Sequence, residues 1–271
     1  MPIQEINGKR IWQKRSNQER IISAILWLIS LSLIAWCWSI ISAQTEWNFV
    51  KDAPKQGADL INRMFPPKWS YLDIKLLKAV WDTMTIATLG TVLGLLLATP
   101  VAFFAARNTT PHPIFRYIAL FIIVATRSIH SLVWALLLVF ALGPGVFAGV
   151  IAIGVRSIGF IAKLLYEAIE EINPKQTEAI TATGASAAQV LTYGVIPQIM
   201  PTFAGLSVFR WDINIRESTV IGLVGAGGIG QALIDSINAF KWSQASIIFI
   251  IIFILVLISE WVSAKARNAI I

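Results

Sequence analysis

The stretch that decides the fold reads Ile21-Ile-Ser-Ala-Ile-Leu-Trp-Leu-Ile-Ser-Leu-Ser-Leu-Ile-Ala-Trp-Cys-Trp-Ser-Ile-Ile-Ser-Ala-Gln-Thr45 and contains no charged residue. It exceeds the roughly 20 apolar residues that cross a membrane as a helix. It is also longer than the roughly 7–15-residue apolar core of a signal peptide, and no small-x-small cleavage site closes it. We therefore expect an uncleaved first span. Its N-terminus should be cytoplasmic because basic residues precede it: Lys9, Arg10, Lys14, Arg15 and Arg20.

The composition supports an integral membrane protein throughout. Of the 271 residues, 56% are hydrophobic and 14% charged, against averages of about 45–50% and about 25% in soluble domains. This excludes a disordered chain and a soluble nucleic-acid-binding protein, so we assign the net charge of +7 to membrane flanks. The single cysteine, Cys37, excludes an intrachain disulfide framework.

Five further apolar segments follow, so the sequence predicts an all-α protein with six transmembrane helices and both termini in the cytoplasm. The segments cover residues 83–106, 117–142, 146–165, 200–224 and 242–259. The third span is long for one straight helix, so it should tilt or break near Arg127, and a break would place Arg127 at the cytoplasmic edge. We divide the chain into 1–82 (cytoplasmic N-terminus, first helix and external loop), 83–264 (core) and 265–271 (cytoplasmic tail).

The external loop carries its own expectations. Pro54, Pro66 and Pro67 should prevent any long helix between residues 46 and 82. Residues 71–81 mix apolar and charged side chains, which is typical of a helix lying at the membrane surface.

Enzymatic chemistry finds no support in the sequence. Residues 225–230 match G-x-G-x-x-G, but a βαβ unit and a following acidic residue are missing, so close helix packing or a re-entrant turn is the better interpretation. The chain has no P-loop, no H-E-x-x-H and no G-x-S-x-G. We expect no catalytic residue, no metal site and no cofactor.

The polar segment between the fourth and fifth spans reads Glu178-Ala179-Ile180-Thr-Ala-Thr-Gly184, followed by Ile196-Pro197. It resembles the EAA loop of ABC-importer permeases, with Ile180 and Gly194 as departures. The resemblance implies a cytoplasmic coupling helix that docks on a separate ATPase subunit, carried by Glu178, Ala179, Gly184, Ile196 and Pro197. Gly184 should permit the bend between two short helices.

Other segments resemble the permease subunit of phosphonate and phosphite importers, which is related to methionine-type permeases. Residues 210–219 are similar to the family pattern R-x-(E/D)-x-N-x-R-x-(S/A)-T, residues 65–67 to its F-P-P, and residues 220–231 to the end of its core. Residues 127–130 fit R-S-x-P except at His130. The resemblance covers about residues 65–260.

This resemblance implies a plasma (inner) membrane permease that works by alternating access. Its expected partners are two ATP-binding subunits, which would bind the ATP, an extracytoplasmic binding protein, a second copy of the chain and membrane lipid, without nucleic acid. The expected cargo is phosphonate, phosphite or phosphate. Three alternatives remain: a permease for methionine or another small solute, a membrane-embedded enzyme, and a stand-alone channel or scaffold, which would need no EAA-like loop.

The fifth span carries charges that need partners or water. At about 100° per residue, Arg210, Asn214 and Glu217 share one face, while Asp212 and Arg216 lie nearly opposite and can pair. These groups either form ion pairs inside the bundle or line a path for an anion. The candidate path residues are Arg210, Asp212, Asn214, Arg216, Glu217, Arg127 and Arg156.

Overall fold

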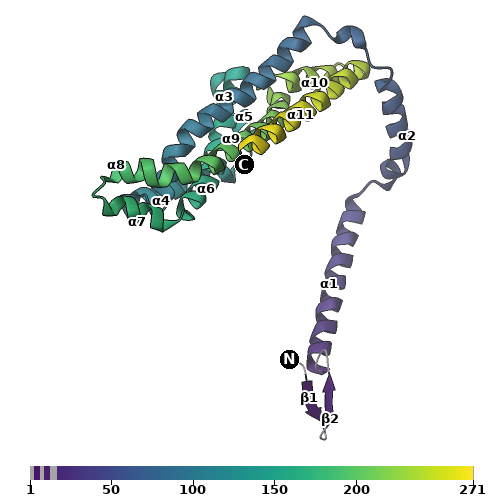
Figure 1. Cartoon of the computed structure of the whole chain (residues 1–271). Helices are drawn as coiled ribbons and strands as arrows, with labels where there is room; N and C mark the ends of the chain where they lie inside the picture. Colours follow the sequence, from purple (N-terminus) through teal and green to yellow (C-terminus); the bar gives the residue numbers. More distant parts are fainter. Residues whose placement is uncertain (1–2, 7–8, 13–16, 271) are drawn as a thin grey trace. The chain divides into compact units, whose positions relative to one another are not determined.

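The computed structural model describes residues 3–6, 9–12 and 17–270, and the chain divides into two units, Met1–Ile61 and Asn62–Ile271 (Figure 1). The all-α membrane fold predicted from the sequence is confirmed, with one small addition. In the N-terminal unit, β1 (Ile3–Ile6) pairs antiparallel with β2 (Lys9–Trp12), a hairpin that the sequence analysis did not predict. Lys14 and Arg15 of the basic flank lie outside the described residues.

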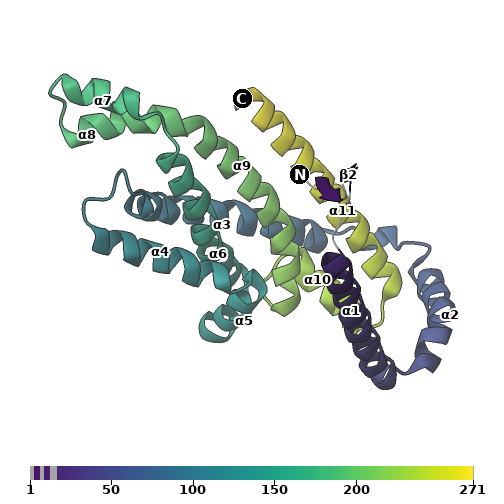
Figure 2. The same cartoon turned by 90° about the horizontal axis from the view of Figure 1, so that it is seen from below.

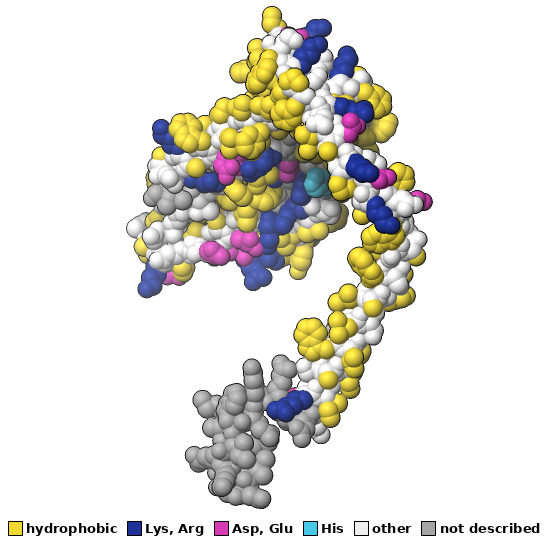
Figure 3. Space-filling view, turned by 90° about the vertical axis from the view of Figure 1, so that its right-hand side faces the viewer, with side chains coloured by type: hydrophobic (Ala, Val, Ile, Leu, Met, Phe, Trp, Pro, Cys, Tyr) yellow, Lys and Arg dark blue, Asp and Glu magenta, His cyan; other side chains and the backbone are white. Residues whose placement is uncertain are grey.

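The first span is α1 (Asn17–Gln44). Its apolar side chains are exposed all round, including Trp27, Leu28 and Ile34. Figure 3 shows hydrophobic side chains exposed over much of the visible face, with charged side chains between them. A soluble protein would not leave such a helix uncovered, whereas lipid covers it without cost.

The loop after α1 corrects two expectations. Residues Trp47–Met64 form α2, a helix that contains Pro54. The helix continues past the proline because only one backbone hydrogen bond is lost and no residue of α2 is buried, so the ring meets no packed neighbour. Residues 71–81 do not form a separate helix either: residues 74–81 are the first turns of the long helix α3 (Ile74–Ala105), and Leu76 is buried there among apolar side chains.

The C-terminal unit holds the other spans (Figures 1 and 2). They are α3, the pair α4 (Pro113–Ser128) and α5 (Ser131–Leu142), α6 (Val146–Glu170), α9 (Ile196–Ile221) and α11 (Trp242–Ile270). The α4–α5 pair bends by 90° and counts as one broken span, which gives six spans with α1. The predicted break near Arg127 is confirmed.

Small residues hold α3 against α6 at close range. A Cβ at Gly94 would overlap Ser157, and a Cβ at Gly154 would lie 2.7 Å from Leu93. Between membrane helices the attraction comes from packing rather than from expelled water, so small residues that let backbones approach are favourable. The α3–α6 pair is therefore the frame on which the remaining helices pack.

The connections gather at two ends of this bundle. At one end, the Asn108 amide donates to Ile169 O (2.6 Å) and the Arg107 backbone N–H donates to the Glu170 carboxylate (2.9 Å). At the other end, Gly145 N–H donates to Gly225 O (3.0 Å). This is the alternation of loops that the predicted topology requires.

Candidate functional site

The predicted coupling segment is a helical hairpin at the end of the bundle that holds Glu170. It consists of α7 (Pro174–Ala182), a turn at Gly184, α8 (Ala187–Val190) and the π-helical turn η2 (Leu191–Val195), which continues into α9 (Figure 2). The Asn173 side chain caps α7 and Ser186 forms a capping box with Gln189. Glu178 and Ala179 are exposed, so the hairpin presents a polar surface beyond the bundle.

The two departures from the EAA pattern fit together in space. A Cβ at Gly194 would lie 3.1 Å from Thr177 Cγ2 and 3.3 Å from Ile180 Cδ1. The larger Ile180 therefore packs over the smaller Gly194, and α7 lies directly on η2. Gly184 has φ +79° and nothing near its side-chain position, so its role is conformational, as expected.

A groove of about 650 Å³ separates α7 from the end of α6. Its walls include Asn108, Glu170, Thr177, Glu178 and Val195. The groove is open, and it lies beside the hairpin that the sequence assigns to ATPase coupling.

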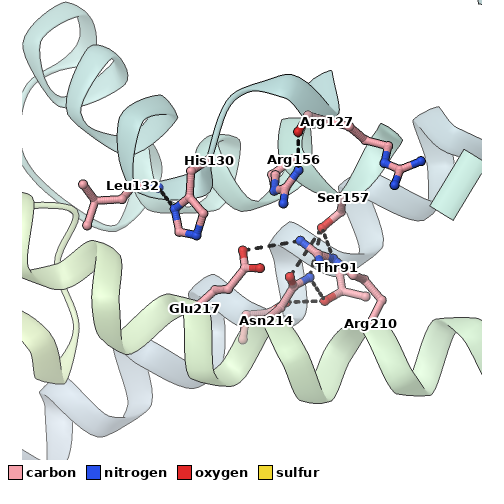
Figure 4. Close-up of polar contacts among 10 residues, drawn as sticks. Thr91, Arg127, His130, Leu132, Arg156, Ser157, Arg210, Asn214 and Glu217 are labelled. Carbon is pink, nitrogen blue, oxygen red and sulfur yellow. Dashed lines mark hydrogen bonds and ion pairs between the residues drawn. The ribbon is translucent and has the colours of Figure 1, made fainter. Parts of the chain in front are cut away.

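In the fifth span, Arg210 and Asn214 meet small polar residues of α3 and α6 (Figure 4). The Asn214 amide donates to Thr91 Oγ1 (2.8 Å) and Ser157 Oγ (3.1 Å). Arg210 Nε donates to Ser157 Oγ (3.0 Å). Arg210 is 2% exposed and Asn214 is fully buried. These hydrogen bonds satisfy polar groups that would otherwise be costly inside apolar packing.

Glu217 completes this cluster. Arg210 Nη2 lies 3.4 Å from Glu217 Oε2, and the Arg210 guanidinium lies 5.0 Å from the centre of the Phe160 ring. The predicted shared face of Arg210, Asn214 and Glu217 is therefore present in the structure, and it points toward α3 and α6. Sequence reasoning missed Thr91, Ser157 and Phe160, because serine, threonine and phenylalanine in a membrane span carry no distinctive pattern.

Asp212 and Arg216 lie on another face and pair as their spacing suggests. Arg216 Nη2 donates to Asp212 Oδ2 (2.6 Å), and Ser259 of α11 donates to Asp212 Oδ1 (2.9 Å). The Asp212 side chain is 6% exposed and that of Arg216 is 42% exposed. The pair is neutral and links α9 to α11.

The break between α4 and α5 lies beside the middle of α6. Arg156 Nη1 donates to the Arg127 carbonyl (2.8 Å), which closes the last turn of α4. The neighbouring Ser157 contacts the buried Arg210, so Arg127 sits level with this cluster rather than at the cytoplasmic end of the bundle, contrary to expectation. Figure 4 shows Arg156, His130 and Glu217 pointing into the space between this break and α9.

A basic row continues from the break along α6. Arg156 and Lys163 are seven residues apart, which places them on nearly the same helix face. Arg127 and Lys163 both line a groove of about 350 Å³ together with Ser128 and Tyr166. Lys163 also contacts Glu167 and Tyr166. Its place beside Arg127 depends on the broken helix, so its role was not visible in the sequence.

The glycine-rich segment packs helices, as its missing nucleotide-binding context indicated. A Cβ at Gly230 would overlap Thr219 O, and a Cβ at Gly228 would lie 2.7 Å from Thr83 Oγ1. The Ile229 backbone N–H donates to Thr83 Oγ1 (2.8 Å). The segment leads into α10 (Ile229–Asn238). Among the described residues, no group of three or more His, Cys, Asp or Glu side chains could hold a metal ion.

The fold and these sites define a membrane-embedded transport subunit: a broken six-span helical bundle with a polar hairpin at one end. Residues 85–263 match the family described as "Binding-protein-dependent transport system inner membrane component". The chain belongs to this family of importer permeases. It is therefore an inner-membrane component of an importer and not an enzyme.

Two named relatives support this family assignment, and one solved structure supports the fold. The chain is 34% identical over 244 residues (90% of this chain, 86% of the relative) to a putative phosphite transport system permease protein of Stutzerimonas stutzeri. It is 38% identical over 212 residues to a phosphate-import permease protein of Mycolicibacterium smegmatis, covering 78% of this chain and 40% of that longer protein. A chain of the inward-facing MetNI methionine ABC transporter has the same fold (TM-score 0.63, 20% identity, 72% of this chain and 96% of that chain).

Proposed function

We propose that this permease imports a phosphorus oxyanion, with phosphite, phosphate and phosphonate as the candidate cargoes. The observation that carries the proposal is the similarity along 90% of the chain to the putative phosphite transport system permease protein of Stutzerimonas stutzeri. The row of cations beside the helix break supports it, because guanidinium groups suit tetrahedral oxyanions. The methionine transporter shares the fold at only 20% identity, which says nothing about cargo.

The working importer contains two copies of this chain, two ATP-binding subunits and an extracytoplasmic binding protein. The permease core is residues 83–264, and both termini face the cytoplasm. ATP binds to the partner subunits, so this chain needs no cofactor. The hairpin around Glu178, Ala179 and Gly184, followed by Ile196 and Pro197, docks on the ATP-binding subunit, because it is the exposed polar element at the end of the bundle.

The path for the anion runs along the side of α9 that faces the helix break. Three arginines lie on this side: Arg127, Arg156 and Arg210. Glu217 adds one carboxylate, so the net charge of these four side chains is positive. On the other side of α9, Asp212 and Arg216 neutralise each other. Arg210 and Asn214 form the buried support behind the path. Weak contacts with exposed or half-buried cations suit a path, because tight binding would prevent release.

The first experiment is uptake of labelled phosphite, phosphate and methylphosphonate, with methionine as the alternative cargo. Cells with and without this chain are compared while all partner subunits are present. Loss of uptake of one oxyanion confirms the proposal and names the cargo. Loss of methionine uptake alone overturns the cargo assignment.

A second experiment tests the path. Arg127→Gln and Arg156→Gln should each lower oxyanion uptake about tenfold, the effect of losing a contact worth about 1.4 kcal/mol. Lys75→Gln, at an exposed position near the start of α3, is the matched control and should leave uptake unchanged. Normal uptake by both variants, with the importer fully assembled, would move the path to another face.

A further inference from the structure

The helix α2 lies outside the residues 85–263 that match the family, and its sequence is strictly divided into two faces. With about 100° per residue, the polar residues fall within one half of the helix circumference: Asn48, Lys51, Asp52, Lys55, Gln56, Asp59, Asn62 and Arg63. The remaining residues, including Phe49, Val50, Leu60 and Ile61, fill the other half. No residue of α2 is buried, so nothing within the described part of the N-terminal unit covers the apolar half.

Side-chain contacts fix the corner between α1 and α2. The Trp47 indole N–H donates to Ser42 O (3.1 Å) and Ser42 Oγ (3.2 Å). The rings of Trp47 and Trp38 lie 6.2 Å apart between centroids. These contacts tie the first residue of α2 to the last turns of α1. Figures 1 and 2 together show that the chain turns sharply here.

This corner determines where α2 can lie. Because α1 crosses the membrane, a helix that leaves its end sideways runs along the membrane surface. Two residues, Thr45 and Glu46, join the helices, which keeps the start of α2 at the level where α1 leaves the lipid. Tryptophan is the residue that prefers this level, with its ring in the apolar region and its N–H near polar groups.

We propose that α2 is a membrane-surface helix whose apolar face inserts into the lipid headgroup boundary on the side where α1 ends. The occupant of this face is lipid. The polar half carries Lys51, Lys55 and Arg63 against Asp52 and Asp59, so its net charge is small. Insertion therefore depends on apolar burial and does not require anionic lipid. The helix anchors the N-terminal arm to the membrane surface.

The test places nitroxide labels on both faces of α2 in the assembled importer. All variants carry Cys37→Ser, which removes the native cysteine. Val50→Cys and Ile61→Cys report the apolar face, and Lys55→Cys is the matched control on the polar face. The importer is reconstituted in vesicles of phosphatidylethanolamine and phosphatidylglycerol, and in vesicles of phosphatidylcholine alone.

Power-saturation measurements compare access by oxygen, which partitions into lipid, with access by a water-soluble nickel chelate. We expect oxygen access to exceed chelate access at Val50 and Ile61 and the reverse at Lys55, in both lipid mixtures. Labels on the apolar face that are shielded from both reagents would show that protein covers it. Chelate access on both faces would show that α2 stands in water. Either result overturns the proposal.

Discussion

Replacing Gly184 by valine tests whether the coupling hairpin depends on one backbone conformation. Gly184 has φ +79° and open space around its side-chain position, so a larger residue meets no neighbour. The whole cost arises from the left-handed backbone, which is about 1–3 kcal/mol for a residue other than glycine. That cost lowers the equilibrium constant between the native hairpin and its other conformations by a factor between about 5 and about 150.

The assay measures ATP-driven uptake and binding of the ATP-binding subunit in proteoliposomes. Gly184→Val should reduce both, by up to about fivefold for a cost of about 1 kcal/mol and by more towards the upper end of the range. Gly184→Asn should retain more activity because asparagine enters the left-handed region more readily. Gly57→Val, at an open helical position of α2, should change neither readout. The reasoning is refuted if Gly184→Val transports normally, or if asparagine and valine are equally damaging.

Three further predictions concern packing and charge. Gly194→Ile should reduce ATP-driven uptake because the new side chain overlaps Ile180, at a cost of about 1–3 kcal/mol. Adding Ile180→Ala should restore uptake, and a double variant that stays inactive would contradict the complementary packing. Gly230→Ala should lower the thermal midpoint of the purified protein by several degrees, because its Cβ overlaps Thr219 O, and an unchanged midpoint would disprove this close approach. Arg216→Ala should lower the thermal midpoint because the buried Asp212 carboxylate loses its partner. Adding Asp212→Asn should recover part of that loss. Lost uptake by Arg216→Ala with an unchanged thermal midpoint would assign Arg216 to the path instead.

Much of the fold follows from the sequence because hydropathy acts residue by residue. The uncharged run at residues 21–45 requires lipid wherever it lies in the chain. The third span was expected to tilt or break because it is long and carries Arg127, and it breaks. The expectation about Pro54 was wrong because an exposed helix tolerates one lost hydrogen bond.

The sequence predicted one part of the candidate site and missed another. The spacing of Arg210, Asn214 and Glu217 placed them on one face, and the spacing of Asp212 and Arg216 predicted their pairing, since helical geometry is local. The partners Ser157 and Thr91 could not be predicted, because they lie on other helices and contact Asn214 only after α3, α6 and α9 have packed.

The sequence by itself therefore determined the membrane class, the six spans and the position of the coupling hairpin, all of which depend on composition and short-range periodicity. The tertiary structure determines which basic residues lie close together. Arg127 meets Arg156 because α4 ends beside the middle of α6, and Ile180 covers Gly194 because α7 folds back on η2. These contacts join residues that are separated along the chain, and their energies are set by close packing that no local pattern records.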